Sequence, residues 1–352
     1  MNDHRPLVLV VHPGTLGDVL LAVEAIRGIR RAFPSHHVVW VGQSEVGKLL
    51  LDGGEVHEIL GIESSILAQL FTHPKHFDDR FASILRRCTH CVCWMTDHDG
   101  ILSNNLQSFG VRCIIQSPQS PDLGAFHQEE RFVQTLQPWG ISADGQKPRL
   151  ALLGNLSIFL EPDNWRARFR FMDSPYIVMH PGSGSPHKCV RASVLAEIGR
   201  GLLGNSGRSL VVLSGPGDQN QVNNFLGELN RTNFHLVSNQ SLTTAAGVLK
   251  NSALFIGHDS GISHLAAGVG TPSIVLFGPT NSAYWAPRGD HVSLIQGTPC
   301  QCAEWKQVQQ CHLKPCLELS ADLILQEAER VLGGRPRPIS RRSRELHIAE
   351  LI

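Results

Sequence analysis

The sequence has no net charge and no long apolar run. Its 31 Lys and Arg residues balance 31 Asp and Glu residues, so it lacks the basic excess that neutralises nucleic-acid phosphates. No stretch approaches the roughly 18 uninterrupted apolar residues of a membrane-spanning helix. The apolar run near the start is short and reads as a core strand rather than a signal peptide. These absences predict a cytoplasmic protein with no nucleic-acid partner and no integral membrane segment.

Charged residues are also scarce, at 18% against 42% hydrophobic residues in a chain of 352. That composition is typical of a folded globular protein. The length exceeds one ordinary core and suits two domains of about 150 residues each. The nine cysteines are spread through a chain long enough to build real cores, which favours reduced thiols over a disulfide scaffold.

Short, apolar, β-branched runs alternate with amphipathic stretches, the pattern of buried parallel strands and their crossover helices. The fold class is therefore α/β. Strands are expected at Leu7–Val11, Val38–Val41, Tyr176–His180, Ser209–Leu213, Ala253–Gly257 and Ser273–Phe277. The first helix is expected to bury Leu20, Val23, Ile26, Ile29 and Phe33, and the last to span Ala321–Leu332. Arg27, Arg30 and Arg31 fall in the last turns of that first helix, where positive charge suits the dipole.

Two segments repeat one plan: LVLVVHPGTLGD at the beginning and YIVMHPGSGSPHK at the middle each place His-Pro-Gly after an apolar strand. A shared three-residue string also arises by chance. Read as a repeat, it predicts two Rossmann-like domains, 1–165 and 166–335, divided near the polar segment Glu161–Pro175. The Arg- and Pro-rich tail 336–352 is a candidate to cross back to the first domain.

Ligands bind at the carboxyl ends of parallel strands, so the loops after the strands hold the candidate site residues. HPGTLGD contains Asp18, which either caps the following helix or has a chemical role. HPGSGSPHK places Ser183 and Gly184 ahead of Lys188. Small residues that expose N–H groups, followed by a cation, suit a phosphate. A turn with a solvated lysine is the alternative.

Two further loops follow buried strands. SGPGD lacks the third glycine of GxGxxG, so an ordinary turn is favoured over a nicotinamide site. IGHDSGISHLAAGVGTP contains Asp259, Ser260, Gly261 and His264 at a helix start, where free N–H groups suit a diphosphate. The same residues suggest a Ser-His-Asp hydrolase, but the GxSxG elbow is missing.

Two groups of residues raise the question of a metal. Asp97, His98 and Asp99 follow an apolar run and resemble either a metal-diphosphate site or acidic turn residues. Four cysteines late in the chain could bind zinc or remain reduced structural thiols, and their spacing lacks paired CxxC knuckles. They are Cys300, Cys302, Cys311 and Cys316. The expectation is that no metal is bound.

Three segments together resemble glycosyltransferase family 9, the ADP-heptose:lipopolysaccharide heptosyltransferases, over nearly the whole chain. IGHDSGISHLAAGVGTPSIVLFGPT is similar to the family's DSGxxHLAAxxGTPxxxLFGPT. GDVLLAVEAIRGIRRAFP is similar to GDxxxxxPAxxxLRxxxP, and HPGSGSPHK to PGSxxxxK. The sequence departs from the pattern at Glu24, where proline is usual, and at Cys189-Val190, where Arg-Trp is commoner. These departures weaken the choice of donor.

The resemblance implies a GT-B fold, with two parallel sheets facing a central cleft. It also implies a reaction that inverts the configuration at the sugar. It makes Asp18 the general base, with Thr15 and Gly17 beside it on the acceptor side. Lys188, Ser183 and Gly184 would stabilise the departing nucleoside diphosphate. The residues expected to hold the diphosphate and ribose are Asp259, Ser260, Gly261 and His264. Cationic and dipolar groups suffice for this leaving group, so no cofactor or divalent metal is expected.

The implied partners are a nucleotide-sugar donor, ADP-heptose, and a glycolipid acceptor on lipopolysaccharide core at the inner-leaflet surface. The protein would then be cytoplasmic and peripheral to the inner membrane. Three alternatives remain: a transferase with another nucleotide sugar, a nucleotide-sugar epimerase, and a non-catalytic nucleotide-sugar binding protein.

Overall fold

A computed structural model describes residues 5–64, 68–72, 77–142, 169, 174–204, 208–230, 234–302, 304–333 and 345–347. The chain divides into two compact units, Met1–Phe159 and Leu160–Ile352, and each is described by itself. The predicted domain boundaries, after residues 165 and 335, lie outside the described residues. Within the described residues no helix is long and apolar enough to cross a membrane.

The first unit contains a five-stranded parallel sheet in the order β3-β2-β1-β4-β5, which is the first part of the Rossmann strand order. All five residues of the central strand β1 are buried, as expected for a parallel strand covered on both faces. The strands are β1 (Leu7–Val11), β2 (His37–Gly42), β3 (Glu58–Gly61), β4 (Cys88–Cys93) and β5 (Arg112–Ile115).

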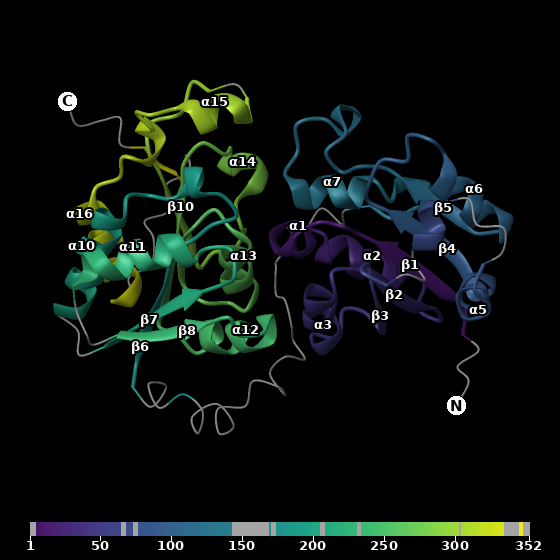
Figure 1. Cartoon of the computed structure of the whole chain (residues 1–352), viewed down its shortest axis with the longest axis horizontal. Coiled ribbons are helices and arrows are strands. Elements are labelled where there is room, and N and C mark those ends of the chain that lie inside the picture. The colour runs from purple at the N-terminus through teal and green to yellow at the C-terminus, as the bar shows by residue number, and fades with distance from the viewer. Residues whose placement is uncertain are drawn as a thin grey trace. The chain divides into compact units, whose positions relative to one another are not determined.

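Helices cover both faces of this sheet (Figure 1). Alternate strand residues, among them Leu9 and Val11, pack against Phe81 and Leu85 of α5 and against α6, while α1, α2, α3 and α7 lie on the other face. The helices are α1 (Leu16–Leu21), α2 (Val23–Ala32), α3 (Ser44–Asp52), α5 (Asp79–Arg87), α6 (Ile101–Ser108) and α7 (Gln128–Gln134). Short 3-10 turns span η1 (Gln69–Phe71), η2 (Pro121–Leu123) and η3 (Gln137–Trp139).

The expected first helix is interrupted. Four of the five residues expected on its buried face are inaccessible to solvent, namely Leu20, Val23, Ile26 and Ile29. The fifth, Phe33, is only half-buried, because α2 ends at Ala32. At Ala22, however, the backbone N–H bonds the carbonyl of Val19 three residues back, which closes α1 and lets α2 begin at the next residue. A periodicity of apolar residues does not report such a break, because the buried face continues across it.

The second unit contains a seven-stranded parallel sheet in the order β12-β11-β10-β9-β6-β7-β8. Read from β8 to β11, this is the full Rossmann order of six strands. The strands are β6 (Tyr176–His180), β7 (Ser209–Ser214), β8 (Phe234–Ser238), β9 (Leu254–His258), β10 (Ser273–Phe277), β11 (Val292–Gln296) and β12 (Glu345–His347). β12 belongs to the tail and pairs with β11.

Two sets of helices sandwich this sheet (Figure 1). Ile177, Leu210 and Ile256 belong to the core under α10, α11 and α16. Val275 and Phe277 face the other way, toward Ala267 of α13 and Ala286 beside α14. The helices are α10 (Ala192–Gly204), α11 (Gln219–Leu229), α12 (Leu242–Lys250), α13 (Gly261–Gly268), α14 (Ser282–Trp285), α15 (Trp305–Gln310) and α16 (Ala321–Leu332). Two 3-10 turns complete it, η5 (Pro186–Lys188) and η6 (Pro315–Leu317).

Candidate functional site

Each Rossmann-like sheet has one point where the strand order reverses, and loops on the two sides of that point form the usual ligand site. In the first sheet the reversal falls between β1 and β4, and in the second between β6 and β9. The two His-Pro-Gly loops therefore occupy equivalent positions, since one follows β1 and the other follows β6. The predicted repeat of one plan is confirmed at this level.

In the first loop Asp18 lies at the third position of α1, and Thr15 is the N-cap. Thr15 donates both its backbone N–H, at 3.1 Å, and its hydroxyl, at 2.9 Å, to Oδ2 of Asp18. No described residue donates to Oδ1 of Asp18, and the side chain is only half-buried. Asp18 thus supports the helix start with one oxygen and presents the other, so the capping and chemical roles are compatible.

Beneath this loop His12 is buried and neutral. Burial lowers its pKa to about 4, although the Asp18 carboxylate opposes the shift. Its Nδ1 accepts the N–H of Gly14 at 3.0 Å, and its ring packs among Trp40, Trp94 and Phe132 at centroid distances of 5.3 to 5.9 Å. The imidazole therefore fixes the backbone turn that leads to Asp18.

The loop after β4 was a candidate metal site because of Asp97, His98 and Asp99. Asp97 accepts the N–H groups of Leu102 at 3.3 Å and Ser103 at 2.9 Å, and Asp99 accepts that of Ile101 at 3.3 Å. Although burial opposes ionisation, these hydrogen bonds lower the pKa of Asp97. The carboxylates therefore cap α6, which is the acidic-turn alternative.

In the second unit the loops after β6 and β9 are joined by an ion pair. Nζ of Lys188 lies 2.7 Å from Oδ2 of Asp259, and the hydroxyl of Thr280, from the loop after β10, donates to the same oxygen at 2.6 Å. The Asp259 side chain is 8% exposed, and the Lys188 side chain is 23% exposed. The ring of Trp305 faces the ammonium, with its centroid at 5.9 Å. A lysine is thus held in place at the switch point with part of its surface open.

Three more hydrogen bonds join these loops. The hydroxyl of Ser183 donates to the backbone carbonyl of Asp259 at 2.7 Å. His258 is fully buried, and burial lowers its pKa to about 4. Its Nε2 accepts the N–H of Val190 at 3.0 Å, while Nδ1 lies 3.3 Å from the carbonyl of Gly182. Gly184, in contrast, is exposed, and a Cβ there would meet no atom within 4 Å.

The remaining donor-side candidates lie at the start of α13. Ser260 is the N-cap and accepts the N–H of Ser263 at 3.4 Å, Gly261 is the first helical residue, and His264 lies one turn on and is buried. Ser260 and Asp259 are engaged with the helix start and with Lys188, which does not resemble a hydrolase triad. The helix start and the Lys188 ammonium together suit an anion.

The SGPGD loop is the predicted strand-to-helix turn, between β7 and α11, and it also carries a buried pair. Asp218 lies 2.5 Å from Nε2 of His180 and accepts the N–H of Gly215 at 2.7 Å. Burial opposes ionisation of Asp218, but His180 and these loop donors lower its pKa. This buried pair fixes the end of β6, from which the second His-Pro-Gly loop leaves.

The four late cysteines are free thiols. Burial opposes ionisation of Cys300, but hydrogen bonds with the other three lower its pKa. The hydrogen bond with Cys300 raises the pKa of Cys302 to about 11, and burial raises the pKa of Cys316 to about 12. In the ranges that the structure describes, no set of three or more His, Cys, Asp or Glu side chains is arranged to hold a metal ion.

Sequence reasoning did not single out Thr280, His258, Asp218 or Trp305. Thr280 belongs to the LFGPT string, which carries the family resemblance but no predicted site residue, and His258 directly precedes the predicted Asp259. Asp218 lies in the SGPGD loop, which lacks a nucleotide fingerprint and so gives no signal for a site residue. The ring of Trp305 reaches Lys188 from a segment 117 residues away in sequence, and no local pattern signals such a contact.

The family model for glycosyltransferase family 9 (heptosyltransferase) matches residues 129–317. Lipopolysaccharide heptosyltransferase 3 of Escherichia coli is 27% identical over 298 residues, which cover 78% of this chain and 84% of that relative. Lipooligosaccharide heptosyltransferase 2 of Haemophilus influenzae is 33% identical over 69 residues, only 20% of either chain.

Two solved structures share the fold along almost the whole chain. A glycosyl transferase family 9 protein from Veillonella parvula has a TM-score of 0.72 at 17% identity, covering 95% of this chain and 99% of that one. The E. coli ADP-heptose lps heptosyltransferase II has a TM-score of 0.72 at 16% identity, covering 94% and 99%. The predicted fold class, α/β of the GT-B type with two Rossmann-like domains, is confirmed.

Proposed function

Because the chain belongs to glycosyltransferase family 9, the heptosyltransferase family, we propose that it moves a heptose from ADP-heptose onto lipopolysaccharide core or a related glycan, with inversion. The chain is a glycosyltransferase. Relatives named as a lipopolysaccharide heptosyltransferase and an ADP-heptose heptosyltransferase support the donor and acceptor. The observation that carries the proposal is the Lys188–Asp259 pair at the second switch point.

The donor's diphosphate is assigned to the second unit. An ammonium has three donors, and Lys188 uses one of them on Asp259, so two remain for phosphate oxygens. The backbone N–H groups of Ser183 and Gly184 and the start of α13 at Gly261 add partial positive charge. His264 and Ser260 complete the contacts to the diphosphate and ribose.

Lys188 has the chemical task of stabilising the departing nucleoside diphosphate. Negative charge grows on the leaving oxygen as the bond to the anomeric carbon breaks, and a fixed cation stabilises that charge more than the charge of the ground state. The Asp259 and Thr280 contacts hold the ammonium at one place before the donor arrives. We infer that transfer needs no divalent metal.

The acceptor's hydroxyl proton is assigned to Asp18. Thr15 holds Oδ2 through two hydrogen bonds, which leaves Oδ1 to take the proton as the acceptor oxygen attacks the anomeric carbon. Thr15 and Gly17 form the backbone around the carboxylate and lie on the acceptor side. Attack from the face opposite the leaving group gives the inverted product.

The acceptor is a glycolipid core sugar, so the protein would bind transiently and peripherally at the inner-leaflet surface. The two-domain division after residue 165 belongs to the same GT-B proposal. The predicted crossing of the tail 336–352 to the first domain does not hold for Glu345–His347, which pair with β11 of the second unit. Neither affects the assignment of the donor and acceptor residues.

A donor panel read by thermal shift tests the proposal. A ligand present at a hundred times its Kd stabilises the fold by about 2.7 kcal/mol, so ADP and ADP-sugars should raise the melting temperature, and UDP-sugars should not. Stabilisation by UDP compounds alone would overturn the heptose assignment. Product analysis then separates the other outcomes: an epimerised nucleotide sugar without any glycoside indicates an epimerase, and binding without any product indicates a binding protein.

A further inference from the structure

A cavity of about 410 Å³ opens in the first unit. It lies at the amino ends of the parallel strands, whereas Asp18 lies beyond their carboxyl ends. β1 and β2 run in parallel with Leu7 beside His37, so residues that precede β2 lie at the start of the strands. Asp18 follows the end of β1, about 15 Å of strand away. The cavity is lined by the arginines of α2 (Arg27, Arg30, Arg31) and by His36 and His57. Its volume is that of a small-molecule site.

The arginines outnumber the carboxylates that pair with them. A carboxylate oxygen of Glu55 lies 2.5 Å from a guanidinium nitrogen of Arg27. Glu24 forms ion pairs with Arg31, at 2.9 Å, and with Arg27, at 3.8 Å. Arg30 donates to the backbone carbonyl of Gly54, a neutral group, and no described carboxylate pairs with it. The cavity wall therefore holds one guanidinium charge more than its carboxylates neutralise.

Other basic groups are crowded around that excess charge. His57 stacks on His37 at 4.9 Å, and its Nδ1 accepts the N–H of Val38 at 3.0 Å, so the neutral ring carries its proton on Nε2. Burial lowers the pKa of His57, and the nearby Arg30, His37 and Arg5 lower it further. Such crowding of like charge is relieved when an anion binds.

The alternative explanation is that the arginines only interact favourably with the negative C-terminal end of the α2 dipole. A helix end carries about half a negative charge, whereas three guanidiniums gather here against two carboxylates. Net positive charge therefore remains after the dipole and the two carboxylates are counted. The dipole also does not explain why a cavity lies between the arginines and the two histidines. The negative helix end weakens an anion site without cancelling it.

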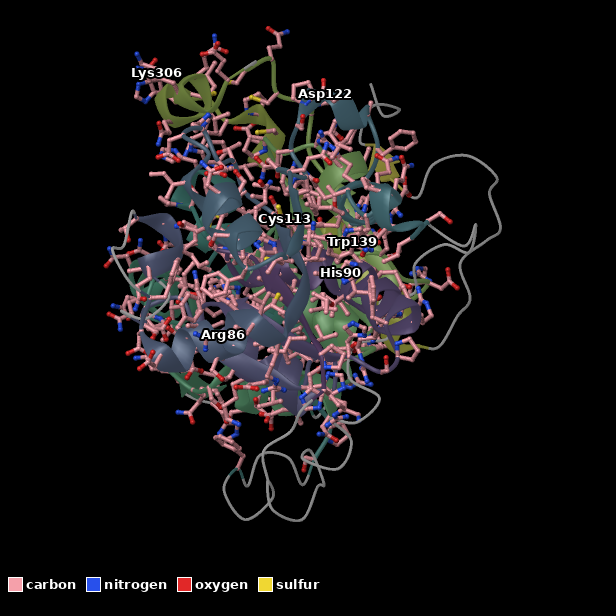
Figure 2. All side chains as sticks on the ribbon, turned by 90° about the vertical axis from the view of Figure 1, so that its right-hand side faces the viewer. Arg86, His90, Cys113, Asp122, Trp139 and Lys306 are labelled. Atoms are coloured by element: carbon pink, nitrogen blue, oxygen red, sulfur yellow. The ribbon has the colours of Figure 1, made fainter. Side chains whose placement is uncertain are left out.

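Two apolar side chains also line the cavity. Phe33 ends α2 and lines the cavity with Pro34. The Phe33 ring packs on His90 at 4.5 Å and on Trp139 at 5.7 Å, and Figure 2 shows His90 and Trp139 side by side. Arginine forks match phosphate oxygens in two-point contacts, while an apolar wall suits the carbon group that a phosphate ester carries.

We propose that this cavity, the arginine pocket of Arg27, Arg30, Arg31, His36 and His57, binds the phosphate group of a phosphate ester. The site is separate from the sugar-transfer residues and goes beyond the proposed function. Two sources share this chemistry: a soluble phosphorylated compound and the headgroup of an anionic lipid at a bilayer surface.

The test uses the full-length chain carrying Lys188→Ala, so that the second unit's phosphate-facing ammonium is removed. In one arm sn-glycerol 3-phosphate is titrated by calorimetry. In the other arm the protein is sedimented with vesicles of phosphatidylglycerol in phosphatidylcholine, and with phosphatidylcholine alone. Arg30→Gln is added to remove the unpaired guanidinium. Arg200→Gln is the matched control, because Arg200 also donates to a backbone carbonyl, that of Glu228 at 2.7 Å.

Arg30→Gln should lower the affinity in at least one arm on the order of tenfold or more, as expected for loss of a charge-assisted contact, and Arg200→Gln should not. Loss in the calorimetric arm identifies a soluble ester, and loss only with anionic vesicles identifies a headgroup. The proposal is overturned if the parent binds neither probe or if both variants behave alike. Should Arg30→Gln fail to fold, Arg31→Gln, with a side chain 56% exposed, must give the same loss.

Discussion

The two His-Pro-Gly loops follow equivalent strands, but they carry side chains of opposite charge. In the first, a half-buried carboxylate, Asp18, is held by Thr15 three residues away. In the second, a cation, Lys188, is held by Asp259 from a loop 71 residues away. Equivalent sheet positions thus present a carboxylate in one unit and an ammonium in the other, which the proposed function uses as proton acceptor and phosphate partner. Inverting sugar transfer needs both groups.

The largest effect is expected from Asp18→Asn. Asparagine supports a helix start about as well as aspartate but cannot accept a proton, so turnover should fall on the order of a hundredfold or more. ADP affinity and melting temperature should stay near wild type, because the nucleotide is assigned to the second unit. Steady-state kinetics and calorimetry measure the two quantities.

Asp97→Asn is the matched control for Asp18→Asn, since the Asp97 carboxylate also accepts helix N–H groups. Its turnover should stay close to that of the wild type. A wild-type rate in Asp18→Asn would remove Asp18 from the mechanism and move the search for the base to the loop after β4.

Acid should destabilise both units through one buried histidine under each loop. His12 and His258 both have a folded-state pKa of about 4, below the unfolded value of about 6.5. The unfolded chain therefore binds protons first as pH falls from 6.5 to 4, and the free energy of unfolding drops by up to about 3 kcal/mol for each ring.

Urea unfolding between pH 7 and pH 4 checks this effect. His36, His57 and His90 add to it in the same direction, because their pKa values are also lowered by burial. His12→Asn should flatten the pH dependence, since a side-chain carbonyl can still accept the Gly14 N–H. A midpoint that rises on acidification would contradict the account of both histidines.

Lys188→Ala should reduce kcat/KM for the donor about tenfold to a hundredfold, the loss of a charge-assisted contact of about 1.5 to 3 kcal/mol. Its melting temperature should also fall, because Asp259 keeps only Thr280 as a partner for the same oxygen. Lys306→Ala, an exposed lysine of α15, is the control. Equal donor kinetics in the two variants would show that the second loop is only a structural turn with no role in donor use.

A smaller effect is expected from Gly182→Ala. A Cβ at Gly182 would lie 2.6 Å from Cγ of Asp218, so the buried pair with His180 must shift, at a cost of about 1 to 3 kcal/mol. Gly184→Ala is the paired variant, because its Cβ meets no atom within 4 Å. Calorimetric melting should separate the two, and equal melting temperatures would show that Asp218 moves freely.

Chelation is expected to have no effect. EDTA should leave transfer unchanged, because Lys188 and helix N–H groups are assigned to the leaving group. Activity lost in EDTA and restored by manganese would contradict this and direct attention back to Asp97 and Asp99.

The strands were predictable, and the contacts within the site were not. β1, β6 and β10 have the predicted bounds, since a buried parallel strand reads as an uninterrupted apolar run. Asp18 could be understood locally, because its partner is Thr15. The Lys188–Asp259, His180–Asp218 and Lys188–Trp305 contacts join loops distant in sequence. Only the folded sheet order brings them together, and no spacing pattern contains that information.

The anomeric configuration of the product tests the central claim most directly. The protein is incubated with ADP-heptose and a lipopolysaccharide core acceptor that lacks the heptose, and the product is examined by NMR. We expect one added heptose with inverted configuration, formed by the wild type and only very slowly by Asp18→Asn. A retained configuration, or release of free heptose without a glycoside, would contradict it.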